Sequence, residues 1–128
     1  MSRDAKGKLN LTIGAGNPST KDLIVFSKQF ATMLSSGVPL VQTIGILAAQ
    51  QRLPTFGAVL EKVRNSVENG ATLSEAFEAY PKIFDTLYIS MVRAGEASGN
   101  LDTILMKLVT YIEKAAKIKS QVDRKSVV

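Results

Sequence analysis

A corner between two helices is encoded by residues 87–102, which read LYISMVRAGEASGNLD. The apolar residues of its first half recur at the three- and four-residue spacing of one helix face: Leu87, Tyr88, Met91 and Val92. Gly95 and Gly99 then bracket a turn, because glycine permits both positive φ and close approach of two backbones. Asn100 is a favourable N-cap for the next helix, and Asp102 lies in its first turn, where a carboxylate suits the helix dipole. The stretch therefore predicts two helices joined by a tight turn.

The helix that follows this corner is expected to be the longest in the chain. Its apolar residues have a heptad-like spacing of four and three: Leu101, Leu105, Leu108, Ile112 and Ala115. A helix from Asn100 to about Val122 would be roughly 33 Å long at 1.5 Å per residue. Lysines replace apolar residues toward its end, so we expect its last turns to protrude from the rest of the fold.

Four further helices are expected upstream, from apolar spacing and from residues that begin or end helices. Capping boxes open two of them, at Ser19 with Asp22 and at Thr72 with Glu75. Glycine, proline and asparagine mark most of the remaining boundaries: Gly37, Pro39, residues 52–54, residues 69–70 and Pro81. No segment alternates like a strand. The expected fold is all-α, a compact bundle of six antiparallel helices with a long C-terminal helix.

The composition is that of one globular domain. Apolar residues make up 45% and charged residues 21% of the 128, which suits a single chain with a buried core. We assign residues 19–122 to the helical domain, 1–18 to a disordered tail or linker, and 123–128 to a second tail that is either disordered or vector-derived. The sequence predicts no signal peptide, and no run of about 18 apolar residues that would span a membrane.

The residue types exclude several kinds of chemistry. There is no cysteine, histidine or tryptophan, which removes thiolate and imidazole catalysis, Ser-His-Asp triads and Cys/His zinc sites. Glu96 and Asp102 are too few for a hard cation held by one chain, although a cation shared between chains would need fewer from each. The sequence after Gly14-Ala15-Gly16 does not continue as a phosphate-binding loop. We therefore expect no enzyme activity, no catalytic residue, no cofactor and no metal site.

Charged residues at the corner and near the C-terminus are the candidate contacts with partners. Arg93 and Glu96 are three residues apart on one helix and are expected to pair, while Glu96 and Asp102 offer carboxylates. A purely structural corner is the alternative. The net charge is +5, and the final helix contributes Lys114, Lys117 and Lys119. Such a basic end can contact nucleic acid, an anionic membrane or an acidic partner, or can be a solvated helix end.

Phenylalanine and tyrosine side chains are expected in different parts of the fold. The phenylalanines fall on apolar stripes and are expected in the core rather than as stacking platforms for bases. We expect Tyr80 and Tyr88 to place a hydroxyl at the surface.

Four ordered motifs resemble the type II secretion F domain. They are FSKQFATMLSSGVPL (26–40), VENGATLSEAF (67–77), residues 81–102 with RAGEASGNLD at their end, and YIEK (111–114) leading into the lysines. The resemblance covers about residues 19–122. It is slightly stronger to the pilus-assembly branch, through FATM (30–33) and KIK (117–119).

This resemblance implies a place and a role for the chain. The family comprises inner-membrane platform proteins of type II secretion and type IV pilus assembly, with two cytoplasmic helical domains and three membrane spans absent from this chain. The chain resembles the first of these domains, at the cytoplasmic face of the bacterial inner membrane. It implies a domain that docks the cytoplasmic assembly ATPase and other inner-membrane components, and that hydrolyses nothing itself.

A bundle with a protruding, partly apolar helix is expected to self-associate as a homodimer. The alternatives to the family role are a basic helical nucleic-acid-binding module, which would need base-reading side chains on a recognition helix, and a general helical adaptor. Because the basic residues cluster in a tail and a terminal helix, we expect no nucleic acid among the partners.

Overall fold

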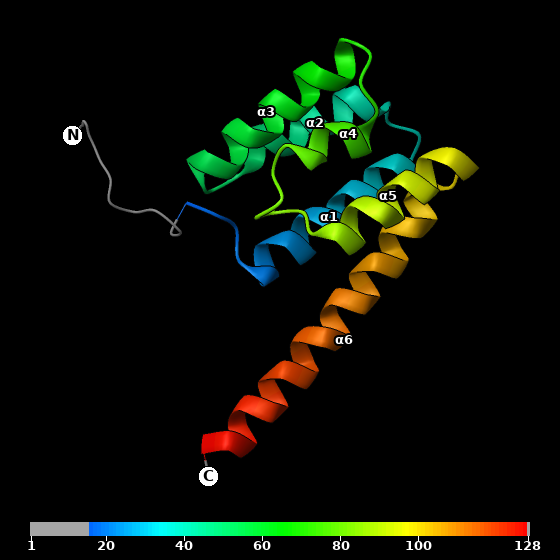
Figure 1. Cartoon of the computed structure of the whole chain (residues 1–128). Helices are drawn as coiled ribbons and strands as arrows, with labels where there is room; N and C mark the ends of the chain where they lie inside the picture. Colours follow the sequence, from blue (N-terminus) through cyan, green and yellow to red (C-terminus); the bar gives the residue numbers. More distant parts are fainter. Residues whose placement is uncertain (1–15, 128) are drawn as a thin grey trace, which may run out of the picture.

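The computed structural model of the protein describes residues 16–127 and contains six helices in that range (Figure 1). Their bounds are α1 (Thr20–Ser35), α2 (Leu40–Gln50), α3 (Pro54–Glu68), α4 (Leu73–Glu78), α5 (Thr86–Ser98) and α6 (Leu101–Val127). No strand occurs among these residues. The all-α prediction with six helices is confirmed. Most of the segment 1–18 expected to be a tail lies outside the described residues, as does residue 128.

Local signals set the helix boundaries as expected. At the start of α1, the Asp22 N–H donates to Ser19 Oγ at 3.1 Å, and the Ser19 N–H donates to Asp22 Oδ2 at 3.0 Å. This second bond stabilises the charged carboxylate and holds the pKa of Asp22 below its ordinary value. The same reciprocal box joins Thr72 and Glu75 at the start of α4, at 3.1 and 2.9 Å. Both predicted capping boxes are confirmed.

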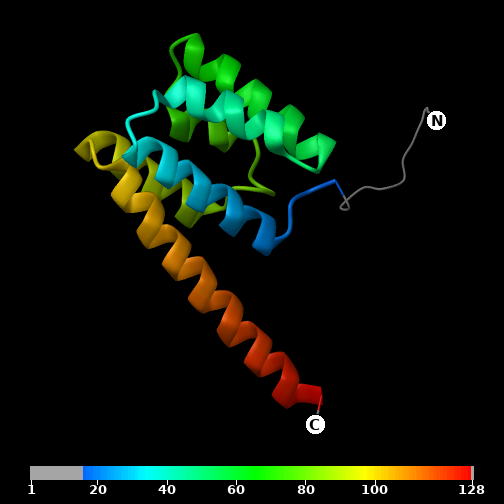
Figure 2. The same ribbon diagram turned by 180° about the vertical axis from the view of Figure 1, so that it is seen from behind.

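The helices pack in two connected groups. Helices α2 and α3 lie against each other, while α1 and α5 both pack on α6. Contacts of α1 with α2, of α3 with α4 and of α4 with α5 join the groups. Seen from behind, α2 and α3 lie together on the side of α1 away from the free end of α6 (Figure 2). Each helix buries only one face, which matches the apolar spacing in the sequence.

Aromatic rings from several helices form the centre of the core. Phe84, between α4 and α5, stacks on Phe77 with ring centroids 3.9 Å apart and lies 5.1 Å from the Tyr88 ring. Tyr88 is only 1% exposed, and its hydroxyl lies 2.6 Å from Ser27 Oγ of α1. The expectation of a surface hydroxyl on Tyr88 was therefore wrong, because a serine from another helix satisfies that oxygen inside the core. Tyr80 is half-buried.

Helix α6 belongs to the bundle over only part of its length. Leu105, Leu108 and Val109 are buried, whereas the side chains of residues 113–121 are exposed apart from the half-buried Ala116. The expected protrusion is confirmed and is plain in Figure 1. The helix continues to Val127, past the Val122 at which we expected it to end. None of the helices described is long and apolar enough to cross a bilayer.

Candidate protein-interaction surfaces

The corner between α5 and α6 is built on two glycines with different tasks. Gly99 has φ +77 and ends α5 in the left-handed conformation, while the Asn100 N–H donates to the Gly95 carbonyl at 3.1 Å. Gly95 is buried, and a Cβ atom there would lie 3.0 Å from the Cα of Leu101. Close approach of the two helices therefore requires a residue without a side chain at 95.

Glu96 does not pair with Arg93. It binds the start of helix α4 instead. Its carboxylate accepts from the Leu73 N–H at 2.6 Å and from the Ser74 N–H at 3.1 Å. Thr72 Oγ1 accepts the next amide, so the first three amides of α4 each have a side-chain acceptor. The carboxylate is also placed at the positive end of the α4 dipole. Glu96 thus holds α4 on α5.

Arg93 reaches across to α4 as well. Its guanidinium donates to Glu78 Oε2 at 2.7 Å, and both side chains are about half exposed. The expected pair between Arg93 and Glu96 was therefore wrong. Spacing along one helix made these two residues candidates for pairing, but α4 supplies a better partner to each of them.

Asp102 joins the beginning of α6 to the end of α1. Its Oδ2 accepts a hydrogen bond from Ser35 Oγ at 3.0 Å. Farther along, Lys28 Nζ of α1 lies 3.0 Å from Glu113 Oε2 of α6. Contacts that pair later residues of α6 with earlier residues of α1 show that these two helices run antiparallel. Arg93, Glu96 and Asp102 thus each make a defined contact within the chain, which supports the interpretation of the corner as structural.

The corner also carries an open hollow with polar walls. It measures about 470 Å³ and is lined by Thr72, Ser74, Glu75, Glu78, Arg93, Glu96 and Ala97. The carboxylates around it are already bonded to the α4 backbone or to Arg93. In residues 16–127 there is no group of three or more acidic residues placed to hold a metal ion. The arrangement offers a polar contact surface with exposed guanidinium and carboxylate groups.

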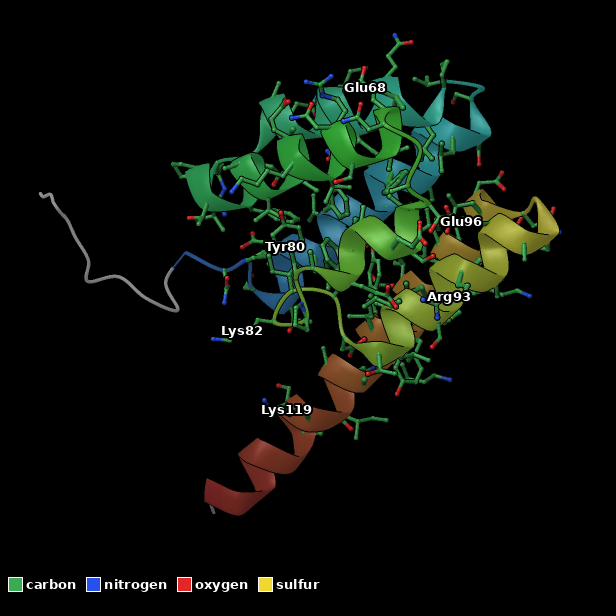
Figure 3. All side chains as sticks on the ribbon, turned by 45° about the horizontal axis from the view of Figure 1, so that its top comes forward. Glu68, Tyr80, Lys82, Arg93, Glu96 and Lys119 are labelled. Carbon is green, nitrogen blue, oxygen red and sulfur yellow. The ribbon has the colours of Figure 1, made fainter. Side chains whose placement is uncertain are left out.

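The three candidate lysines lie far from this corner. Lys114, Lys117 and Lys119 are exposed on the protruding part of α6. Asp102 and Lys119 are seventeen positions apart on this helix, or roughly 25 Å along the axis. Figure 3 shows Arg93 and Glu96 near the α4–α5 contact and Lys119 on the free end of α6. The six candidate residues therefore form two surfaces, the corner and the end of α6.

A third surface was missed by the sequence analysis. Where α6 leaves the bundle, a hollow of about 260 Å³ is lined by residues of α1, the α4–α5 segment, α5 and α6. Tyr111 is among them and is 55% exposed. The sequence does contain a sign of this surface. Tyr111 directly precedes the seam residue Ile112, so the apolar stripe is wider there than a strict heptad.

A known protein family matches most of this chain. The family model described as type II secretion system (T2SS), protein F matches residues 26–127, which include the corner and α6. The chain belongs to the type II secretion system protein F family. This confirms the resemblance read from the four motifs.

Individual members of the protein F family are similar along most of this chain. It is 47% identical over 109 residues to the type IV pilus assembly protein PilC of Myxococcus xanthus, which covers 85% of the chain and 26% of that relative. It is 44% identical over 105 residues to PilC of Thermus thermophilus, covering 82% and 26%. The type II secretion system protein F of Vibrio cholerae is 41% identical over 106 residues, covering 83% and 26%. The chain thus spans about a quarter of the length of these relatives.

Proposed function

We propose that this chain is a cytoplasmic protein-interaction domain of an inner-membrane platform protein for type IV pilus assembly or type II secretion. Membership of the protein F family supports this, with relatives named for both machines at 47% and 41% identity. By its motif order the chain corresponds to the first cytoplasmic domain of such a protein. Its task is to dock the assembly ATPase and other components, without hydrolysing a substrate itself.

The feature that carries the proposed mechanism is the two-part helix α6. Its first half is held between α1 and α5, while its second half extends past the bundle with exposed side chains. A helix clamped at one end acts as a lever for whatever its other end contacts. We propose that displacement of the bundle by the ATPase is transmitted along α6 toward the membrane-embedded part of the platform.

Charge reversal on the lever tests this mechanism. Lys114, Lys117 and Lys119 are changed together to Glu in the full-length platform protein, and pilus number or secreted protein is measured in cells. We expect a large loss of output, while the purified chain keeps its thermal midpoint because all three side chains are exposed. Unchanged output from a stably expressed variant would reject the mechanism.

A charge swap at the corner tests ATPase docking. Arg93→Glu is the better probe, since reversing Glu96 would also release the start of α4. We expect Arg93→Glu to weaken co-purification of the cognate ATPase. The double variant Arg93→Glu, Glu78→Arg restores the ion pair within the chain but keeps the reversed surface. Recovery of ATPase binding in the swap would show that the pair is only structural.

Self-association is proposed as a second interaction, in the form of a symmetric dimer. Sedimentation of the purified chain over a range of concentrations checks it, and a strict monomer at high concentration would contradict it. Family membership argues against the nucleic-acid-binding and general adaptor alternatives. DNA binding with a steep salt dependence would favour the first of them again.

A further inference from the structure

The hollow where α6 leaves the bundle has an apolar floor. We call it the elbow and define it by Leu23, Ile83, Leu87, Tyr111 and Ile112, which line its volume of about 260 Å³. Leu23, Ile83 and Ile112 are half-buried against the core, so the floor is continuous with the packed interior. The walls come from the bundle on one side and from α6 on the other.

The elbow keeps large apolar groups in contact with water. Tyr111 is 55% exposed and Leu87 is 37% exposed. Ala115 and Ile118 continue from Tyr111 at spacings of four and three along α6, and Ile118 is 54% exposed. Single exposed apolar residues are ordinary, but a group that shares one hollow and one helix stripe is typical of an interaction site.

Each side of this apolar floor carries a lysine, one in the lining and one farther along α6. Lys82 lines the hollow from the bundle, and Lys119 lies on α6 (Figure 3). Figure 3 shows both on the side where the bundle and α6 form an angle. Asp85 is the acidic residue of the lining, and its carboxylate already accepts the Tyr88 N–H at 2.8 Å. From Glu113 to Lys125 the sequence holds five basic residues and two acidic ones.

We infer that the elbow binds an acidic amphipathic helix of a partner protein. Apolar side chains of such a helix, repeating at three and four residues, would enter the hollow, and its carboxylates would meet Lys82 and Lys119. A hollow between two walls fits a helix better than it fits a flat bilayer surface. A second copy of this chain would bring the same lysines to the elbow, so we place the contact of the proposed dimer on another surface. The inference rests on the proposed function, because it supplies one of the surfaces by which an interaction domain would work.

A defined peptide tests the inference without a pilus or secretion assay. The probe is a labelled helical peptide of about 18 residues, with leucines at three- and four-residue spacing and glutamates elsewhere. Fluorescence anisotropy measures its binding to the purified chain. Two control peptides have the same composition with the leucine spacing broken, or lysines in place of the glutamates. We expect binding of the acidic amphipathic peptide alone, and weaker binding at high salt.

Matched variants locate the binding. Tyr111→Ser and Lys119→Glu should each weaken binding about tenfold, as expected for a central anchor and a charged rim contact. Val25→Ser removes a side chain of similar exposure, 47%, from the surface of α1, and Lys62→Glu makes the same charge change on α3. These two controls should stay within about twofold of the unmodified chain. Circular dichroism confirms that each variant is folded.

Several results would overturn the inference. They are no binding up to about 1 mM peptide, equal binding of the control peptides, or equal loss from Lys62→Glu and Lys119→Glu. Binding to phosphatidylglycerol vesicles that Tyr111→Ser abolishes, without peptide binding, would reassign the elbow to the membrane. A dimer that Tyr111→Ser dissociates would reassign it to a second copy. None of these results would reject the proposed function, because that function is tested separately by pilus number or secreted protein in cells.

Discussion

At the residue scale, the contact between Ser27 and Tyr88 shows how this core tolerates polar groups. The two hydroxyl oxygens are 2.6 Å apart and both residues are buried. Each would lose its hydration without compensation if the other were absent, so the pair is favourable only as a pair. Burial raises the pKa of Tyr88 well above its ordinary value, because a buried phenolate would be poorly solvated, although the Ser27 hydrogen bond acts in the opposite direction.

The effects of removing the two hydroxyls should therefore be coupled. We expect Tyr88→Phe or Ser27→Ala to lower the free energy of unfolding by about 1–2 kcal/mol, because one buried oxygen loses its partner. The double variant should lose clearly less than the sum of the two. Urea denaturation at neutral pH measures all three, and strictly additive losses would contradict the pairing.

The raised pKa of Tyr88 also predicts a pH dependence. Folding favours the neutral phenol, so this contribution to stability is fully present below about pH 10, the pKa of an unfolded tyrosine. It is lost as the pH rises from there through the higher folded pKa. Tyr88→Phe should therefore lose less stability than the unmodified chain above pH 10. Parallel pH profiles for both proteins would refute this, since other groups titrate equally in the two.

At the scale of elements, α4 depends on its neighbours. It has six residues, too few for a helix that is stable by itself. Its first amides are bonded to Thr72 and to Glu96 of α5, and its buried residues include Leu73 and Phe77. The capping box could be predicted from the sequence because its two residues are three positions apart. The Glu96 cap could not, since it comes from a residue more than twenty positions later.

Loss of this cap should loosen α4 specifically. We expect Glu96→Ala to lower the free energy of unfolding by about 1–3 kcal/mol, because two backbone donors lose a charged acceptor. Hydrogen exchange should accelerate most at the amides of Leu73 and Ser74. Glu78→Ala is the matched control, as it removes a carboxylate from an exposed ion pair and should change stability by less than about 1 kcal/mol. Similar effects of the two substitutions would reject the capping role.

At the scale of the whole molecule, one aromatic cluster joins helices from both groups. Phe26 of α1 lies 5.3 Å from Phe56 of α3 and 6.4 Å from Phe84, measured between ring centroids. Phe84 in turn contacts Phe77 of α4 and Tyr88 of α5. Edge-on and stacked rings at these distances add to the stabilisation from burial. The cluster should make the bundle unfold as one unit.

Truncation of the central ring tests this cooperativity. We expect Phe84→Ala to lower the free energy of unfolding by about 3–5 kcal/mol, because it leaves a cavity among four other rings. Unfolding of the unmodified chain should be a single transition with matching midpoints by circular dichroism and tyrosine fluorescence. Tyr111→Ala, an aromatic truncation outside the cluster, should change stability far less. Separate transitions for the α2–α3 pair and the remainder would contradict a single cooperative core.

The sequence by itself determined the local elements and the family. Capping boxes, glycine ends and apolar spacing act within one turn or one helix, so Ser19, Thr72, Gly99 and the α6 seam could be read directly, and four ordered motifs identified the protein F family. The tertiary structure decided which side chains meet across helices. It placed Glu96 and Arg93 on α4, buried the Tyr88 hydroxyl against Ser27, and exposed Tyr111 in the elbow. These contacts depend on how helices far apart in sequence pack against each other. The spacing of residues along a single helix does not determine that packing.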